Sequence, residues 1–113
     1  MYQIQGIENT NNFSIFRAEI TWSEGQYDKA HVLFLQAAKA DPKSWVPFYY
    51  LGNYYERSGP KQDLDRARKC FEKSFSLNPH SMEAGSALSD IYFKQVSGMA
   101  EILKRESRIF CSL

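Results

Sequence analysis

The sequence has little of what usually signals catalysis or metal binding. Its 113 residues include two cysteines, Cys70 and Cys111, and two histidines, His31 and His80. The cysteines lack the CxxC spacing of zinc sites, and a disulfide framework would need more of them. Glycine-rich phosphate loops of the GxGxxG or GxxxxGK[ST] type are absent. We therefore expect no metal, no cofactor and no small-molecule ligand.

Long hydrophobic runs and an excess of one charge are also missing. The start, MYQIQGIENTNN, has neither the basic residues nor the apolar run of a signal peptide, and no stretch approaches membrane-spanning length. With 14 Lys and Arg against 13 Asp and Glu, the formal net charge is +1. Charge therefore gives no reason to expect a nucleic acid or a membrane as partner. We expect a cytoplasmic chain and leave a nuclear location open, since free thiols suit a reducing compartment.

The candidate catalytic groups are isolated from one another. Neither histidine has a nucleophile and an orienting acid at a recognisable spacing. Cys70 precedes Phe71 on an expected helix, where packing is the simpler role. Asp63 and Asp65 match the charge preference of a helix N-terminus rather than an acid–base pair. These patterns predict that the chain is not an enzyme, and the mixed charges of RARKCFEK predict no direct binding of nucleic acid.

An internal repeat dominates the middle of the chain. The segments KAHVLFLQAAKADP and RARKCFEKSFSLNP align without a gap, and Ala30 and Ala67 are 37 residues apart. Four positions recur at the same intervals: Ala30, Phe34, Ala37 and Pro42, then Ala67, Phe71, Ser74 and Pro79. A second group follows each proline: Phe48, Leu51, Gly52 and Tyr55, then Leu88, Ser89 and Tyr92. An aromatic, Leu-Gly and Tyr followed by Ala, Phe and Pro is the tetratricopeptide order.

The chain therefore resembles the tetratricopeptide repeat (TPR) family over nearly all of residues 14–96. The resemblance implies an all-α fold, a TPR-type α-solenoid of antiparallel helix pairs with about two and a half repeats. We assign a polar N-terminal segment (1–12), repeats (13–43 and 44–80), the first helix of a third repeat (81–96), and a degraded second helix or tail (97–113). Because repeats bury their faces only against neighbours, we expect a segment of a longer solenoid.

Hydrophobic periodicity and stop signals predict five helices in this region. Asp41-Pro42 and Asn78-Pro79 each end a helix, and Ser44 and Ser81 are the expected N-caps of the next ones. Small residues such as Gly52 allow the helices of a pair to approach closely. The expected ranges are 13–24, 28–40, 44–58, 63–77 and 81–96.

In the family that this chain resembles, the first helix of each pair lines a concave groove. Projecting one face of those helices predicts an acidic and aromatic groove: Glu19, Trp22, Val46, Tyr49, Asn53, Glu56, Asp90 and Phe93, with Ile15 and Ser86 on the same face. Tyr and Trp are the residue types that most often anchor partner chains. The sequence equally allows that several of these residues are buried against neighbouring helices. Chaperone-binding relatives clamp a carboxylate with Lys, Arg and Asn; only Asn53 matches, and the acidic residues would repel that group.

A narrower resemblance lies in LGNYYER, DLDRARKCFEKSF, EAGSALSD and the long connection SGPKQDLD. Together these segments resemble the central repeats of the TPR scaffold subunits of the Ski (superkiller) complex. That resemblance implies a fragment of a non-catalytic cytoplasmic scaffold that holds an RNA helicase and a WD40 subunit and supports 3'-5' exosome-mediated mRNA decay. The alternative is a generic TPR adaptor that binds an extended peptide or helix in its concave groove.

Overall fold

The structure, a computed structural model, describes the backbone of residues 2–57 and 59–112, and the side chains of 13–57 and 59–105. Within these ranges it contains five α-helices and no strand, which confirms the all-α prediction. The helices are α1 (Tyr2–Ser23), α2 (Tyr27–Ala40), α3 (Trp45–Glu56), α4 (Leu64–Leu77) and α5 (Met82–Ser112).

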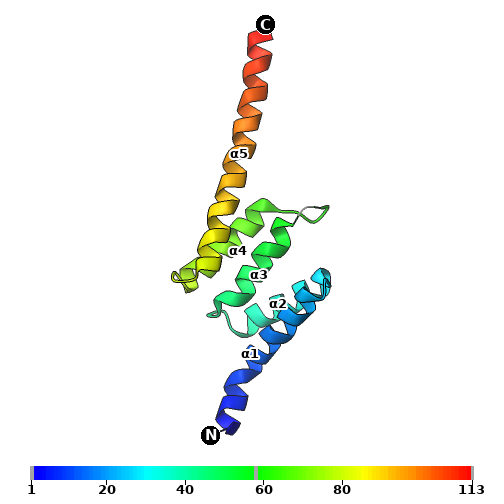
Figure 1. The fold of residues 1–113 in the computed structure, drawn as a ribbon, viewed down its shortest axis with the longest axis vertical. Coiled ribbons are helices and arrows are strands. Elements are labelled where there is room, and N and C mark those ends of the chain that lie inside the picture. Colours follow the sequence, from blue (N-terminus) through cyan, green and yellow to red (C-terminus); the bar gives the residue numbers. More distant parts are fainter. Residues whose placement is uncertain (1, 58, 113) are drawn as a thin grey trace.

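The helices stack in chain order into an elongated body (Figure 1). α1 packs on α2 and α3 packs on α4, while α2 contacts α3 and α4 contacts α5. The two termini lie at opposite ends of a molecule that measures 75 × 28 × 19 Å. Its radius of gyration is 18.1 Å, against about 13 Å for a compact domain of 100 residues. This succession of helix pairs that contact mainly their neighbours is a TPR-like solenoid.

Two phenylalanines occupy equivalent places in the core. Phe34 packs with Ala18 of α1 and Leu51 of α3, and Phe71 lies in the next cluster with Ile91 of α5. Both phenylalanines are fully buried, which stabilises each site by about 1.5–3 kcal/mol relative to an exposed ring. Each ring thus joins the first helix of its own pair to the first helix of the next pair, as the repeat in the sequence predicts.

The connections between the helices follow the expected stop and start signals, with one exception. Ser81 Oγ accepts a hydrogen bond from the backbone N–H of Ala84 at 3.1 Å, and Asp63 caps α4 by accepting from the N–H of Arg66. Ser44 stands at the N-cap position of α3 without a side-chain cap bond. The predicted start of α3 is therefore confirmed, while the capping bond that we expected there is not formed.

The outer helices are longer than the sequence analysis expected. α1 begins at Tyr2 rather than at 13. α5 continues to Ser112, so residues 97–112 form neither a separate second helix nor a non-helical tail. The physical reason is that neither extension contains a proline, and the one glycine in each, Gly6 and Gly98, costs only about 1 kcal/mol relative to alanine in a helix.

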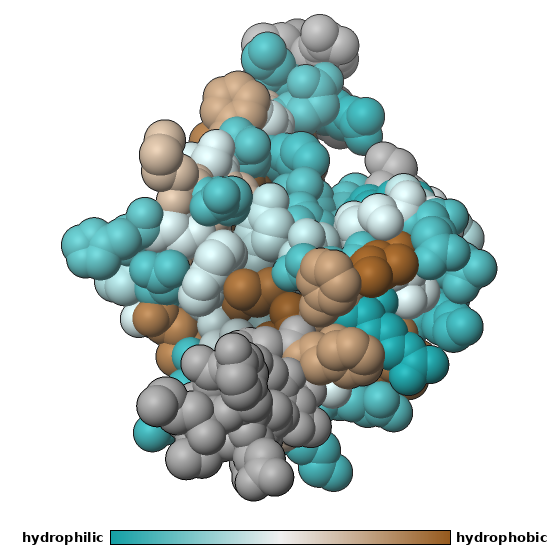
Figure 2. Space-filling view, turned by 60° about the horizontal axis from the view of Figure 1, so that its bottom comes forward, coloured by the Kyte–Doolittle hydropathy of each residue, from teal (hydrophilic) through white to brown (hydrophobic). Residues whose placement is uncertain are grey.

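Large apolar side chains remain exposed towards both ends of the molecule. Phe13 of α1 is 68% exposed and Phe93 of α5 is 73% exposed. On the face shown in Figure 2, hydrophobic side chains gather near the middle, with hydrophilic ones around them. None of the helices in the described ranges has an apolar stretch that could cross a bilayer.

Gly52 permits the close contact between α3 and α4, and its replacement tests that contact. A Cβ atom at Gly52 would lie 2.5 Å from the nearest atom of the Phe71 ring, which is fully buried, so the ring or the helices would have to shift. We expect Gly52→Ala to lower the free energy of unfolding by about 1–3 kcal/mol through overpacking. Chemical denaturation followed by circular dichroism measures the change.

Gly98→Ala is the matched control for this prediction. A Cβ atom at Gly98 has no neighbour within 4 Å, and alanine favours a helix by up to about 1 kcal/mol over glycine. This variant should keep or raise the stability. An equally stable Gly52→Ala protein would show that the ring of Phe71 does not fill the space above Gly52.

Candidate functional site

An open hollow of about 550 Å³ lies where the first helices of successive pairs meet. Its lining comes from α1, from α3 with the residue that follows it, and from α5: Trp22, Tyr49, Tyr50, Asn53, Glu56, Arg57 and Lys94. We call this site the inter-pair hollow. Because both helix pairs and α5 contribute to it, its shape depends on how these elements stack.

Four of the predicted groove residues line this hollow together, namely Trp22, Tyr49, Asn53 and Glu56. The other four do not line it: Glu19 and Val46 are half-buried, and Asp90 and Phe93 are exposed. Of the two residues on the same predicted face, Ile15 is buried and Ser86 is exposed. The geometry therefore brings half of the predicted set into one place, and a binding role for the set remains a prediction.

Aromatic rings form one wall of the hollow and are fixed by the core behind them. Tyr50 stacks on the buried Phe34, with ring centroids 4.5 Å apart. Trp22 and Tyr49 meet Tyr50 edge-to-face at 5.6 and 5.4 Å. Burial raises the pKa of Tyr50, and the nearby carboxylate of Glu19 adds to the rise. The wall is thus an uncharged and preorganised surface, because its rings are already packed before anything binds.

Glu56 gives the hollow an unused hydrogen-bond acceptor. Its Oε1 atom lies 3.6 Å from Nζ of Lys94 on α5. Its Oε2 atom is buried and has no hydrogen-bond partner, and no other buried side-chain atom of the described residues shares this condition. Leaving such a group unpaired costs about 1–3 kcal/mol or more for a charged group. The arrangement therefore suits a donor, such as an N–H group of a bound chain or a water molecule.

Three residues of the hollow were missed by the sequence analysis: Tyr50, Arg57 and Lys94. Arg57 follows the last residue of α3, and its guanidinium lies 3.5 Å from the ring centroid of Tyr27. Lys94 directly follows the predicted Phe93 in the sequence, and it lines the hollow where Phe93 does not. A search of the sequence for opposite charges about one repeat apart would have found Glu56 and Lys94, and so could have identified Lys94.

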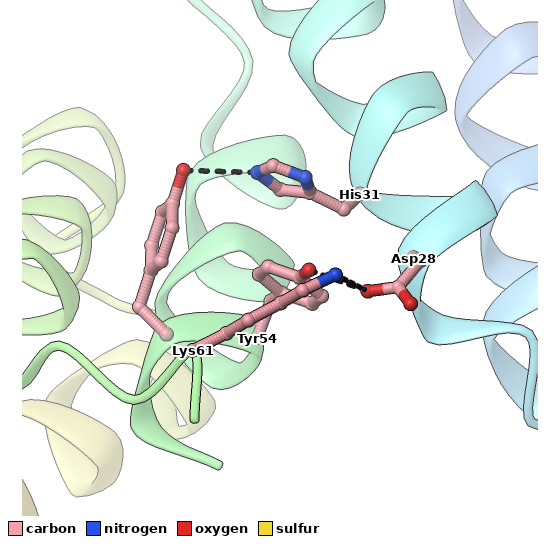
Figure 3. Close-up of polar contacts among 5 residues, drawn as sticks. Asp28, His31, Tyr54 and Lys61 are labelled. Carbon is pink, nitrogen blue, oxygen red and sulfur yellow. Dashed lines mark hydrogen bonds and ion pairs between the residues drawn. The ribbon is translucent and has the colours of Figure 1, made fainter. Parts of the chain in front are cut away.

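A second candidate is a polar cluster between α2, α3 and the segment before α4 (Figure 3). Tyr54 Oη and Lys61 Nζ both donate to Oδ1 of Asp28, at 2.6 and 2.9 Å. His31 Nε2 forms a 2.9 Å hydrogen bond with Oη of Tyr55 and stacks on Tyr54 at a centroid distance of 4.1 Å. These contacts tie the connection between α3 and α4 to the preceding pair.

The charges in this polar cluster are already matched by neighbours. The Tyr54 hydrogen bond, followed by the Lys61 ammonium, lowers the pKa of Asp28, and the Asp28 hydrogen bond raises the pKa of Lys61. Burial lowers the pKa of His31, which keeps its imidazole neutral at pH 7. The exposed Asp28–Lys61 pair adds little stability, because water screens it. The donors and acceptors of the cluster are therefore hydrogen-bonded to one another, as in a contact that stabilises the fold.

Other chemical groups add no further site. In the described part of the chain, no group of three or more His, Cys, Asp or Glu is placed to hold a metal ion. Burial raises the pKa of the Cys70 thiol to about 11, so the group is protonated at pH 7 and packs beside the first core cluster. The side chain of Cys111 lies outside the described residues.

Comparisons with known proteins agree with the fold. No family model matches the chain. It is 48% identical over 63 residues to tetratricopeptide repeat protein 37 of Xenopus laevis, and 39% identical over 70 residues to superkiller complex protein 3 of Mus musculus and of Homo sapiens. The matches cover 56% and 60% of this chain and 4% of each relative. The chain thus resembles TPR proteins, including the superkiller complex subunit.

The environment of His31 predicts a pH-dependent stability. Its pKa in the folded chain lies below the ordinary value of 6.5, so the unfolded chain binds a proton more readily. The free energy of unfolding should therefore fall as the pH is lowered through 6.5 and level off below the folded pKa. The charged groups that act on His31 are Asp28, Lys61 and Arg66; the lowered pKa of Asp28 and the raised pKa of Lys61 keep these two groups charged in this range. Thermal melts between pH 8 and 5.5 measure the effect.

Replacing each histidine in turn assigns this effect. His31→Phe preserves the possibility of stacking on Tyr54 and removes the titrating group, so the melting temperature should vary less with pH in this window. His80→Asn changes an exposed residue and should leave the slope as it is. An unchanged slope in His31→Phe would show that another group causes the dependence.

Proposed function

We propose that this chain is a non-catalytic interaction scaffold of the Ski-complex TPR type, and that the inter-pair hollow is part of its partner-binding surface. The observation that carries the proposal is the hollow itself, which has an aromatic wall and is lined by Glu56, whose Oε2 atom is buried and unpaired. Tyr and Trp anchor many protein interfaces. Leaving a buried acceptor unpaired costs free energy, and a partner whose donor reaches that acceptor would remove this cost.

The specific assignment is supported by the similarity to superkiller complex protein 3. On this assignment the chain is a fragment of the scaffold subunit, works in the cytoplasm, and contributes to 3'-5' exosome-mediated mRNA decay. Its partners are then an RNA helicase and a WD40 subunit. The match spans 4% of that relative, so these partners are proposed from the resemblance to the Ski-complex scaffold.

The generic TPR adaptor remains the second candidate function. A hollow of about 550 Å³ is open enough to admit side chains of an extended peptide or a helix. Lys94 and Arg57 stand beside Glu56 at its edge, so both signs of charge are available to a bound chain. An adaptor of this kind would use the same residues as the scaffold, with a different partner.

Affinity purification of the tagged chain from cytosolic extract tests the proposal. We expect the RNA helicase and the WD40 subunit to be recovered together with exosome subunits. The double variant Asn53→Arg/Glu56→Arg places two long cationic side chains in the hollow and removes the carboxylate of Glu56 from its lining. Recovery of these partners should fall at least about tenfold, the effect of losing roughly 1.4 kcal/mol of binding free energy.

The matched control is Gln36→Arg/Glu101→Arg, which makes the same kinds of change at two exposed positions outside the hollow. It should recover the partners as well as the unmodified chain does. Recovery of chaperones alone would instead favour the adaptor. Equal losses in both double variants would show that the hollow has no specific role in binding.

A further inference from the structure

A second cavity, of about 350 Å³, lies beside the long connection between α3 and α4. Its lining comes from the turn between α1 and α2, the start of α2, the end of α3 and the connection itself. We call this cavity the turn pocket. The lining belongs to two successive helix pairs, so the pocket lies within the stack and not at an end of it.

The connection that forms one wall of the pocket is held against the end of α3. The backbone N–H of Asp63 donates to the carbonyl oxygen of Tyr55 at 2.8 Å. The N–H of Gln62 donates to the carbonyl oxygen of Gly59 at 3.1 Å, and its side-chain amide donates to that of Glu56. These hydrogen bonds fix the wall before any ligand binds.

Two cations in the pocket are anchored on consecutive residues at the start of α2. The guanidinium of Arg57 lies 3.5 Å from the ring centroid of Tyr27. The ammonium of Lys61 donates to Oδ1 of Asp28 at 2.9 Å, and Figure 3 shows its side chain extending across to that carboxylate. Each cation is therefore positioned by the preceding helix pair.

The two cations are not equally compensated. Lys61 forms an ion pair with Asp28. The side chain of Arg57 forms no ion pair and no hydrogen bond with any described residue. Two cations against one carboxylate leave the pocket with one positive charge. A bound group that carries a single negative charge would match it.

Arg66 shows how another arginine over a ring is compensated in this chain. Its guanidinium lies 5.2 Å from the ring centroid of Tyr55, and its Nε atom lies 3.9 Å from Oδ2 of Asp63. Arg57 has the closer ring and lacks the carboxylate. Because stacking uses the face of a guanidinium, the N–H groups in its plane stay free. Those donors match the two oxygens of a carboxylate.

The rest of the pocket offers apolar surface around these charges. Tyr27, Tyr54 and Pro60 contribute to its lining. Such surface can pack against the methylene groups of a glutamate or aspartate side chain. Access is open on the side of the turns, because a Cβ atom at Gly25 or Gly59 would meet nothing within 4 Å. An acidic side chain therefore uses more of the pocket than a small inorganic anion does.

Arg57 connects the turn pocket with the inter-pair hollow, because it lines both. A chain that occupies the hollow can therefore place a neighbouring side chain in the pocket. One uncompensated positive charge favours a side chain of a polypeptide over a nucleic acid, whose phosphates are neutralised by several cations.

We propose that the turn pocket binds the carboxylate of an aspartate or glutamate side chain from the partner that occupies the inter-pair hollow. The carboxylate makes a bidentate contact with Arg57 and accepts a further hydrogen bond from Lys61. An ammonium has three donors, and Lys61 uses one of them for Asp28. The origin of the side chain rests on the proposed function, whereas the pocket and its charge do not.

NMR titration of the whole ¹⁵N-labelled chain with two matched probes tests the pocket itself. N-acetyl-glutamate amide should shift the side-chain N–H signal of Arg57, with a dissociation constant on the order of 10 mM. N-acetyl-glutamine amide, which lacks the charge, should leave the signal in place. The ionic strength is kept constant, because salt screens exposed charges.

Two results of this titration would overturn the proposal. The first is an Arg57 signal that the glutamate probe does not shift. The second is a signal that inorganic phosphate shifts and the glutamate probe does not, since the pocket would then select a phosphate group.

Lys61→Gln and Lys94→Gln separate the turn pocket from the hollow, because Lys61 lines only the pocket and Lys94 only the hollow. Lys61→Gln should weaken binding of the glutamate probe about threefold, as expected for an exposed charge. Arg57→Gln should weaken it at least about tenfold, since it removes hydrogen bonds to a charged group. Lys94→Gln should bind the probe like the unmodified chain. Loss of binding in Lys94→Gln alone would place the carboxylate in the hollow and contradict the proposal.

Affinity purification with Lys61→Gln distinguishes this inference from the proposed function. Recovery of the partners should fall about threefold, while the circular dichroism spectrum stays the same because the Asp28–Lys61 pair is exposed. Full recovery with Lys61→Gln, together with loss in Asn53→Arg/Glu56→Arg, would overturn this inference and keep the proposed function. Reduced recovery with Lys61→Gln and full recovery with the double variant would support the turn pocket and contradict the role of the hollow.

Discussion

The contact of a phenylalanine with a small residue on the facing helix determines the geometry of this molecule. Phe71 over Gly52, and Phe34 with Ala18, bring the two helices of each pair close together. The same rings also reach the first helix of the following pair, through Leu51 and Ile91. One side chain per pair therefore sets both the spacing within a pair and the stacking between pairs. The inter-pair hollow lies beside the first helices that these rings bring together.

The fold could be predicted because its signals are local in the sequence. The recurrence of Phe34 as Phe71, with prolines eight residues after each, is visible without any knowledge of long-range packing. The continuation of α5 was not predicted. The apolar residues after 96 were interpreted as the start of another element, although no proline or cap separates them from α5. Periodicity shows that a stretch is helical, but only a stop signal shows where a helix ends.

Four of the seven residues that line the hollow could be predicted from the sequence, for a related reason. Trp22, Tyr49, Asn53 and Glu56 follow from the helical period within single helices. Lys94 depends on the rotation of α5 relative to α3, which is set by the packing of Ile91 on Phe71 and cannot be read from either helix alone. A single position of error on α5 turns the projected face by about 100°. A rotation of this size decides whether a projection selects Lys94, the ion-pair partner of Glu56, or the exposed Phe93 beside it.

The neighbour-to-neighbour packing of the helices also bears on how the chain folds. Apart from small contacts of α3 with α1 and with α5, the helix pairs that touch are adjacent in sequence. Such a low contact order is typical of fast folding, since only short loops must close before the interactions form. Adjacent pairs can then open or close as separate cooperative units. Amide hydrogen exchange would be slowest around Phe34 and Phe71 and fastest along the projecting half of α5.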